Sequence, residues 1–133
     1  MEEADIRRAR EALYDAIVTR AFVRASDADI ISRRGTLKEN GWLFDLRSIL
    51  LNQETLLQVH TLFSHAFSDK KILQVGGLET AGIPIVSALV ALSRTETPPS
   101  IPSGFFIRKS RKKDGLMRAI EGSITPGVPI EIG

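Results

Sequence analysis

Cysteine is absent from this 133-residue chain, and no apolar stretch is long enough to span a bilayer. The lack of cysteine excludes disulfides, thiolate metal ligands and a cysteine nucleophile, and it agrees with a reducing compartment. The N-terminal residues 1–5 are acidic, unlike a signal peptide. We therefore expect a cytoplasmic protein without a membrane partner.

A strong excess of one charge is also missing, since 18 lysines and arginines face 16 acidic residues. Domains that bind duplex nucleic acid usually carry a larger basic excess, gathered on one face. The near balance therefore argues against a nucleic-acid partner. Hydrophobic residues make up 43% of the chain, which is enough for one folded domain with a real core.

Two segments have the periodicity of amphipathic helices. Apolar residues recur at helical spacing within residues 4–23. Asn52 is suited to cap a second helix that runs to about residue 68. The expected buried stripe of this second helix consists of Leu56, Val59, Leu62, Phe63 and Phe67.

Between the helices, residues 30–41 have turn-like composition and residues 42–47 are typical of a strand, in which Asp45 and Arg47 can form an ion pair.

A βαβ unit is predicted in the second half of the chain. Residues 71–75 form a β-type run that ends at Gly76-Gly77, the apolar helix 82–92 follows, and residues 104–108 form another strand. Such units favour a parallel sheet, so the fold class is α/β. Taken alone, the two glycines are best explained as a tight turn. Glycines before a helix can also admit an anion to the helix N-terminus.

The segment 108–113 reads Arg-Lys-Ser-Arg-Lys-Lys and carries five positive charges without a negative one. A solvated turn, a nucleic-acid or membrane patch, and a phosphate-binding loop are the three interpretations. The run leaves a strand at its C-terminal end, where open α/β sheets bind ligands, and this favours the phosphate-binding loop. Arginine offers a planar fork and lysine a mobile charge, a combination that suits a polyphosphate. We find neither a nucleophile–base pair nor a metal-ligand cluster in the sequence.

The order of residues 104–122 resembles the catalytic-loop region of orotate phosphoribosyltransferases. In that family a strand precedes Arg-Lys-x-x-Lys-Asp-His/Tyr-Gly, and Glu-Gly and Pro-Gly come later. Here Glu121-Gly122 and Pro126-Gly127 follow at the matching distance. Residues 79–88 resemble the family's Gly-Ile-Pro segment at the pyrophosphate turn, and residues 40–47 resemble its aromatic strand beside the pyrimidine.

The resemblance implies a type I phosphoribosyltransferase-like α/β domain with a parallel sheet flanked by helices, incomplete at the C-terminus. It implies one domain, residues 1–133, with an N-terminal helix and hood-like segment at 1–50 and a βαβ core at 51–133. The implied reaction transfers the phosphoribosyl group from phosphoribosyl pyrophosphate to orotate in pyrimidine nucleotide (UMP) biosynthesis. Mg²⁺ is the implied cofactor, and a homodimer is the implied assembly.

Residue by residue, the resemblance places the pyrophosphate on the basic loop. Arg108, Lys109 and Lys112 match positions that bind pyrophosphate, often across a dimer, and Lys112 matches the loop lysine linked to catalysis. Asp114 lies in the same loop, where histidine or tyrosine is usual. Arg33 and Phe44 fall near the positions that contact the base.

Departures from the family pattern leave a second interpretation open. Ala81 stands where many members have a lysine, so one positive charge is lost in the pyrophosphate turn. The family's acidic pair and ribose-phosphate loop would begin near residues 129–133, so we expect the chain to lack that part. A non-catalytic relative that binds phosphoribosyl pyrophosphate or a nucleotide as a regulator is therefore the alternative to an enzyme.

Overall fold

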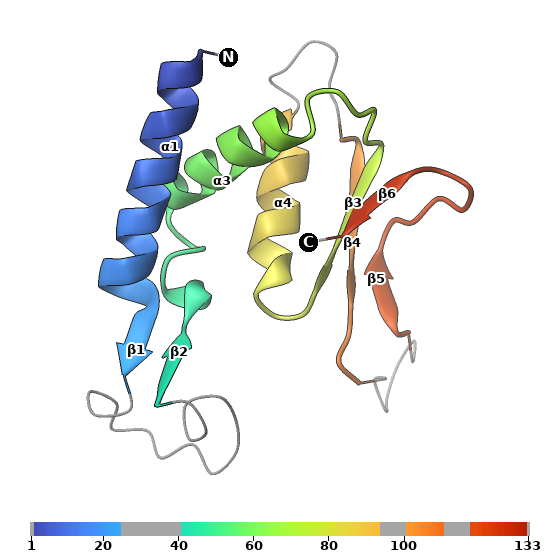
Figure 1. Ribbon diagram of the computed structural model, residues 1–133. Helices are drawn as coiled ribbons and strands as arrows, with labels where there is room; N and C mark the ends of the chain where they lie inside the picture. The colour runs from blue at the N-terminus through green and yellow to red at the C-terminus, as the bar shows by residue number, and fades with distance from the viewer. Residues whose placement is uncertain (1, 25–40, 94–100, 111–117, 133) are drawn as a thin grey trace.

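The computed structural model describes residues 2–24, 41–93, 101–110 and 118–132. In chain order the elements are α1 (Glu3–Ala16), the π-helical turn η1 (Ile17–Ala21), β1 (Phe22–Arg24), β2 (Trp42–Phe44), the 3₁₀ turn η3 (Leu46–Ser48), α3 (Gln53–Ala66), β3 (Gln74–Leu78), α4 (Gly82–Ser93), β4 (Ser103–Ile107), β5 (Ile120–Gly122) and β6 (Ile130–Ile132) (Figure 1). In this part of the chain, no helix has the length and apolar character needed to cross a membrane.

The main sheet has four strands in the order β5-β4-β3-β6. β3 runs parallel to β4 and to β6, whereas β5 is antiparallel to β4. α4 connects β3 to β4, so the predicted βαβ unit is confirmed. Figure 1 shows α4 against the sheet, α3 crossing α4, and α1 outermost, in agreement with the contacts between these elements.

Gly76 and Gly77 lie inside β3, so the prediction of a tight glycine turn after the strand is wrong. The reason is close packing on both faces. A Cβ on Gly76 would lie 2.5 Å from Cζ of Phe105, and a Cβ on Gly77 would lie 3.2 Å from Cα of Gly82. Glycine at these positions lets an aromatic ring and the start of α4 approach the strand.

The first predicted helix is confirmed in its main part but ends earlier than expected. α1 stops at Ala16, η1 adds one π-helical turn, and Phe22 begins β1 instead of continuing the helix. β1 pairs antiparallel with β2, with Phe22 opposite Phe44. Pairing with a distant strand therefore overrides the local helical periodicity at residues 22–23.

The second predicted helix is confirmed, including its cap. The Asn52 side chain accepts a hydrogen bond of 3.2 Å from the backbone N–H of Thr55. The predicted stripe is only partly buried, and it divides between two core clusters. Phe63 and Phe67 pack against the cluster of Ile72, Val75, Val86, Leu89 and Ile101. Leu56 and Val59 pack against the cluster of Ala16, Ala21, Ile49 and Leu50.

The strand predicted at residues 42–47 is shorter, because β2 ends at Phe44 and a turn follows. The expected ion pair is confirmed, since Nε of Arg47 lies 2.9 Å from Oδ1 of Asp45. The turn-like segment predicted at residues 30–41 lies, except for Gly41, outside the described ranges.

Candidate functional site

The C-terminal ends of β3 and β4 meet at one edge of the sheet, because the two strands are parallel and Leu78 lies opposite Ile107. The backbone N–H of Glu79 donates to the carbonyl oxygen of Ile107 at 3.0 Å. The backbone N–H of Lys109 donates to Oε1 of Glu79 at 2.7 Å. The peptide bond between Glu79 and Thr80 is cis. A side chain from the β3–α4 turn thus fixes the start of the basic run.

Arg108 is held toward β5. Its backbone N–H donates to the carbonyl oxygen of Ala119 at 2.9 Å, and its Nη1 lies 3.7 Å from Oε1 of Glu121. The buried Nε of Arg108 has no hydrogen-bond partner among the residues that the structure describes. A buried N–H without an acceptor is unfavourable.

An open hollow of about 540 Å³ lies at these strand ends, and we call it the strand-end hollow. Three parts of the chain form its walls: the turn after β2, the β3–α4 connection with the start of α4, and the start of the basic run. The lining residues are Leu46, Arg47, Leu50, Leu78, Glu79, Thr80, Ala81, Gly82, Ile85 and Lys109. The hollow combines an apolar wall with two cations, one carboxylate and a helix N-terminus, which favours anions.

The structure places only some of the predicted site residues. Lys109 lines the strand-end hollow, and Arg108 precedes it at the end of β4. Phe44 lies on β2, is 47% exposed and does not line the hollow. Its ring centroid lies 5.3 Å from that of Trp42 and 5.5 Å from that of Phe22. Arg33, Lys112 and Asp114 lie outside the described residues.

Two charged residues of the hollow, Arg47 and Glu79, are not predicted as site residues from the sequence. Arg47 was predicted only as a partner of Asp45, and Glu79 only as part of a motif. The one available signal for Glu79 was its position directly after a buried strand. For Arg47 there was none, because its place in the hollow depends on packing between segments that are distant in sequence.

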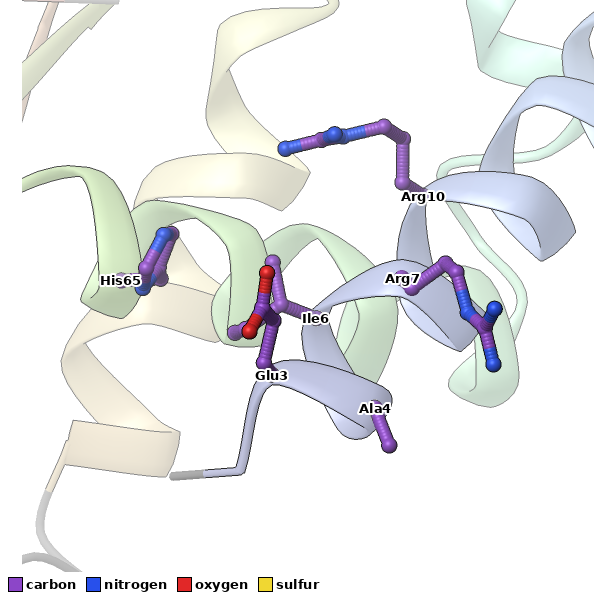
Figure 2. Close-up of a pocket in the computed structure, with 6 residues that line it drawn as sticks. All are labelled: Glu3, Ala4, Ile6, Arg7, Arg10 and His65. Carbon is purple, nitrogen blue, oxygen red and sulfur yellow. The ribbon is translucent and has the colours of Figure 1, made fainter.

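A second hollow, of about 640 Å³, is lined by residues of α1 and α3. Its lining residues are Glu3, Ala4, Ile6, Arg7, Arg10 and His65 (Figure 2). Arg7 and Arg10 point away from each other in Figure 2 and do not converge on one position. Across the described parts of the chain, no three histidine or acidic side chains are grouped closely enough to hold a metal ion.

The α/β fold is similar to that of solved phosphoribosyltransferases. A solved phosphoribosyltransferase from Corynebacterium diphtheriae matches 94% of this chain over 64% of its own length, with a TM-score of 0.69 and 21% identity. The orotate phosphoribosyltransferase of Mycobacterium tuberculosis H37Rv in complex with phosphoribosyl pyrophosphate matches 99% of this chain over 58% of its length, with a TM-score of 0.60 and 20% identity.

Sequence comparison agrees with the fold. The orotate phosphoribosyltransferase of Rhodopseudomonas palustris strain TIE-1 is 32% identical over 113 residues, which are 85% of this chain and 57% of the relative. No protein-family model matches the chain. The chain is thus a distant homologue of orotate phosphoribosyltransferases that spans little more than half of their length. The resemblance and the α/β fold class expected from the sequence are both confirmed.

Proposed function

We propose that the chain binds phosphoribosyl pyrophosphate and transfers its phosphoribosyl group to orotate, a pentosyltransferase reaction of pyrimidine nucleotide biosynthesis. The strand-end hollow carries this proposal, since it joins a cationic loop start to a helix N-terminus at the edge where α/β sheets bind ligands. The homology to orotate phosphoribosyltransferases supports the choice of reaction.

The basic loop is assigned to the pyrophosphate. In the proposed reaction a cation-like sugar and a strongly anionic leaving group develop together, and fixed positive charge stabilises the leaving group. Arg108 and Lys109 bind the pyrophosphate from the end of β4. By the resemblance, Lys112 is assigned as the catalytic residue, and Lys112 and Asp114 are both assigned to pyrophosphate binding.

The base is assigned to the hood segment, residues 1–50, and the pyrophosphate to the core, residues 51–133. Phe44 offers a half-exposed aromatic face, which suits stacking on a pyrimidine ring. Arg33 is assigned to the base by the resemblance alone. The hood segment lies directly beside the core, because Ala81 and Ile85 pack against the cluster that contains Leu50.

Mg²⁺ is assigned as a cofactor that enters with the pyrophosphate. Mg²⁺ is commonly held by substrate phosphates, water and one or two carboxylates, and a dedicated protein cage is not needed. Glu79 is the carboxylate that lines the strand-end hollow, and it fits this limited role. When bound, the ion neutralises charge on the leaving group.

A cytoplasmic homodimer is the proposed assembly, because the basic loop of the family often reaches the pyrophosphate across a dimer. Light scattering coupled to size exclusion measures the mass directly. A homodimer has twice the 14.6 kDa of one chain. A monomeric mass at the concentrations used for ligand binding would contradict this part of the proposal.

The central test is calorimetry with pyrophosphate and with phosphoribosyl pyrophosphate in the presence of Mg²⁺. The double variant Lys109→Ala/Lys112→Ala should bind both ligands at least about tenfold more weakly, because two charge-assisted contacts are removed. The matched control is Lys70→Ala/Lys71→Ala, which removes the same charge from two exposed lysines between α3 and β3. The control should bind like the wild type.

The outcomes separate the possible functions. Equal affinity of the wild type and the Lys109/Lys112 variant would remove the pyrophosphate assignment. Binding of phosphoribosyl pyrophosphate without formation of orotidine monophosphate from orotate would favour the non-catalytic regulator. Tight binding to generic DNA that weakens steeply with salt would instead favour a nucleic-acid module.

A further inference from the structure

The turn after β2 is anchored on two sides. The backbone N–H of Asp45 donates to the carbonyl oxygen of Ala21 at 2.7 Å, and Oγ of Ser48 donates to the carbonyl oxygen of Arg20 at 3.0 Å. Ile49 and Leu50, which follow directly, are 1% and 3% exposed and belong to a core cluster. The turn is therefore a fixed base for the side chain of Arg47.

Packing brings this turn to the start of α4. Ala81 and Ile85 pack against the core cluster that contains Leu50. Leu46 and Leu50 then line the strand-end hollow together with residues 80–82. Arg47 lies between these two leucines in sequence and lines the same hollow. The hood segment therefore places a positively charged side chain at the edge of the sheet.

The guanidinium of Arg47 is oriented by one hydrogen bond, and its terminal nitrogens keep donors for a ligand. Its Nε donates to Oδ1 of Asp45 at 2.9 Å. Arginine has further N–H donors on its two terminal nitrogens, and within the described residues these have no other ion-pair partner. An arginine held at Nε presents a planar pair of terminal nitrogens, which is the geometry that suits phosphate oxygens.

The charges of the residues that line the hollow favour a contact between Arg47 and an anionic ligand. Arg47 and Lys109 are the two cations among its lining residues, and Glu79 is the one carboxylate. Residues 80–82 and Ile85 bring no charge. Among the described lining residues the charges of Lys109 and Glu79 cancel, so Arg47 provides the net positive charge of this lining, in addition to the other cations of the basic run.

We propose that Arg47 binds the pyrophosphate group from the hood side, across the strand-end hollow from the β4 end that carries Lys109, and that Asp45 positions its guanidinium. This inference rests on the proposed function and extends it, since it gives the hood segment a part in holding the diphosphate as well as the base. The ligand then bridges hood and core.

Arg8 provides a matched control for Arg47. Both arginines are 67% exposed, and both form an ion pair with an aspartate that is close in sequence, Asp5 for Arg8 and Asp45 for Arg47. Arg8 lies on α1 and does not line the hollow. The variants Arg47→Ala and Arg8→Ala therefore have the same change in net charge and lose the same kind of exposed ion pair.

Calorimetric titration of the full chain with Mg²⁺-pyrophosphate tests the proposal. Arg47→Ala should weaken binding about tenfold, the loss expected for a charge-assisted contact, and Arg8→Ala should stay within about twofold of the wild type. Arg47→Lys should lie between wild type and Arg47→Ala, because lysine keeps the charge but lacks the fork. Far-UV circular dichroism checks that each variant has the wild-type fold.

Two results would overturn the inference while the proposed function stands: Arg47→Ala binds like the wild type although Lys109→Ala/Lys112→Ala does not, or Arg8→Ala loses as much affinity as Arg47→Ala. In the second case the affinity for pyrophosphate would depend on the net charge of the chain and not on the position of Arg47. Absence of pyrophosphate binding by the wild type would overturn both the inference and the function on which it rests.

Discussion

Gly76 and Phe105 illustrate how single residues set the spacing of the sheet. Side chains alternate along a strand, and added Cβ atoms on Gly77 and Gly104 would meet Val86 of α4. Gly76 and Phe105 therefore face away from α4, where the ring of Phe105 covers Gly76. Phe105 is only 3% exposed. The space that a side chain at residue 76 would take is thus occupied by the ring of Phe105 from the neighbouring strand β4.

Gly76→Ala should destabilise the protein by about 1–3 kcal/mol, because the added carbon would lie 2.5 Å from Cζ of Phe105. Urea unfolding measures the free energy. The double variant Gly76→Ala/Phe105→Leu should lose less than the sum of the two single variants, since leucine lacks the distal ring atoms. Strict additivity would show that the contact is not the cause.

At this scale the sequence predicts residues whose role is local. Asn52 was assigned correctly as a cap because its partner, Thr55, is three residues away. The role of Gly76 was missed, since glycine is equally a turn residue and a packing residue, and only Phe105 decides between them. The contact of Glu79 with Lys109 spans 30 residues and leaves no local pattern.

At the scale of elements, Gln74 ties β3 to the segment that leads into β6. The side chain is fully buried; its Nε2 donates to the carbonyl oxygens of Thr125 and Val128 at 2.9 and 3.0 Å, and its Oε1 accepts from the N–H of Thr125 at 2.9 Å. Both the amide nitrogen and the amide oxygen of the Gln74 side chain are therefore hydrogen-bonded. One side chain thus closes the loop before the edge strand.

Gln74→Leu should lower the free energy of unfolding by about 2–4 kcal/mol, because backbone groups of Thr125 and Val128 lose their partners. Hydrogen exchange should quicken at the Thr125 amide. The control Gln53→Leu, at an exposed position at the start of α3, should change stability by less than about 0.5 kcal/mol. An unchanged Thr125 exchange rate in Gln74→Leu would contradict the anchoring role.

The sequence predicts an element well where its periodic pattern is long and no pairing with a distant segment overrides that pattern. α3, α4 and β4 follow the sequence closely. The sequence places the end of the first helix too late, because residues 22–23 fit a helix pattern as well as a strand pattern. The strand β2, whose pairing decides between them, begins 20 residues later along the chain. The three-residue strands β5 and β6 are too short for a periodic signal.

For the molecule as a whole, residues before and after position 50 share one hydrophobic cluster. Leu56 and Val59 of α3 and Ile85 of α4 pack against the cluster of Ala16, Ala21, Ile49 and Leu50. Each part would expose apolar surface if it separated from the other. The two parts should therefore unfold as one unit.

Trp42 is the single tryptophan of the chain and lies in the hood segment, so its fluorescence reports on that part alone. Urea transitions followed by Trp42 fluorescence and by far-UV circular dichroism should coincide, as expected for one cooperative transition. Loss of the Trp42 signal at lower urea than the loss of helix would show that the hood segment unfolds independently.

The bond between Glu79 and Lys109 has a consequence for how a ligand leaves. A phosphate oxygen that takes the Lys109 N–H must displace a carboxylate that belongs to the chain. The displaced Glu79 stays tethered beside the donor, where it acts as a competitor at high effective concentration. Under the proposed function, a diphosphate bound at this N–H would compete with Glu79 for it, and this competition would speed its release.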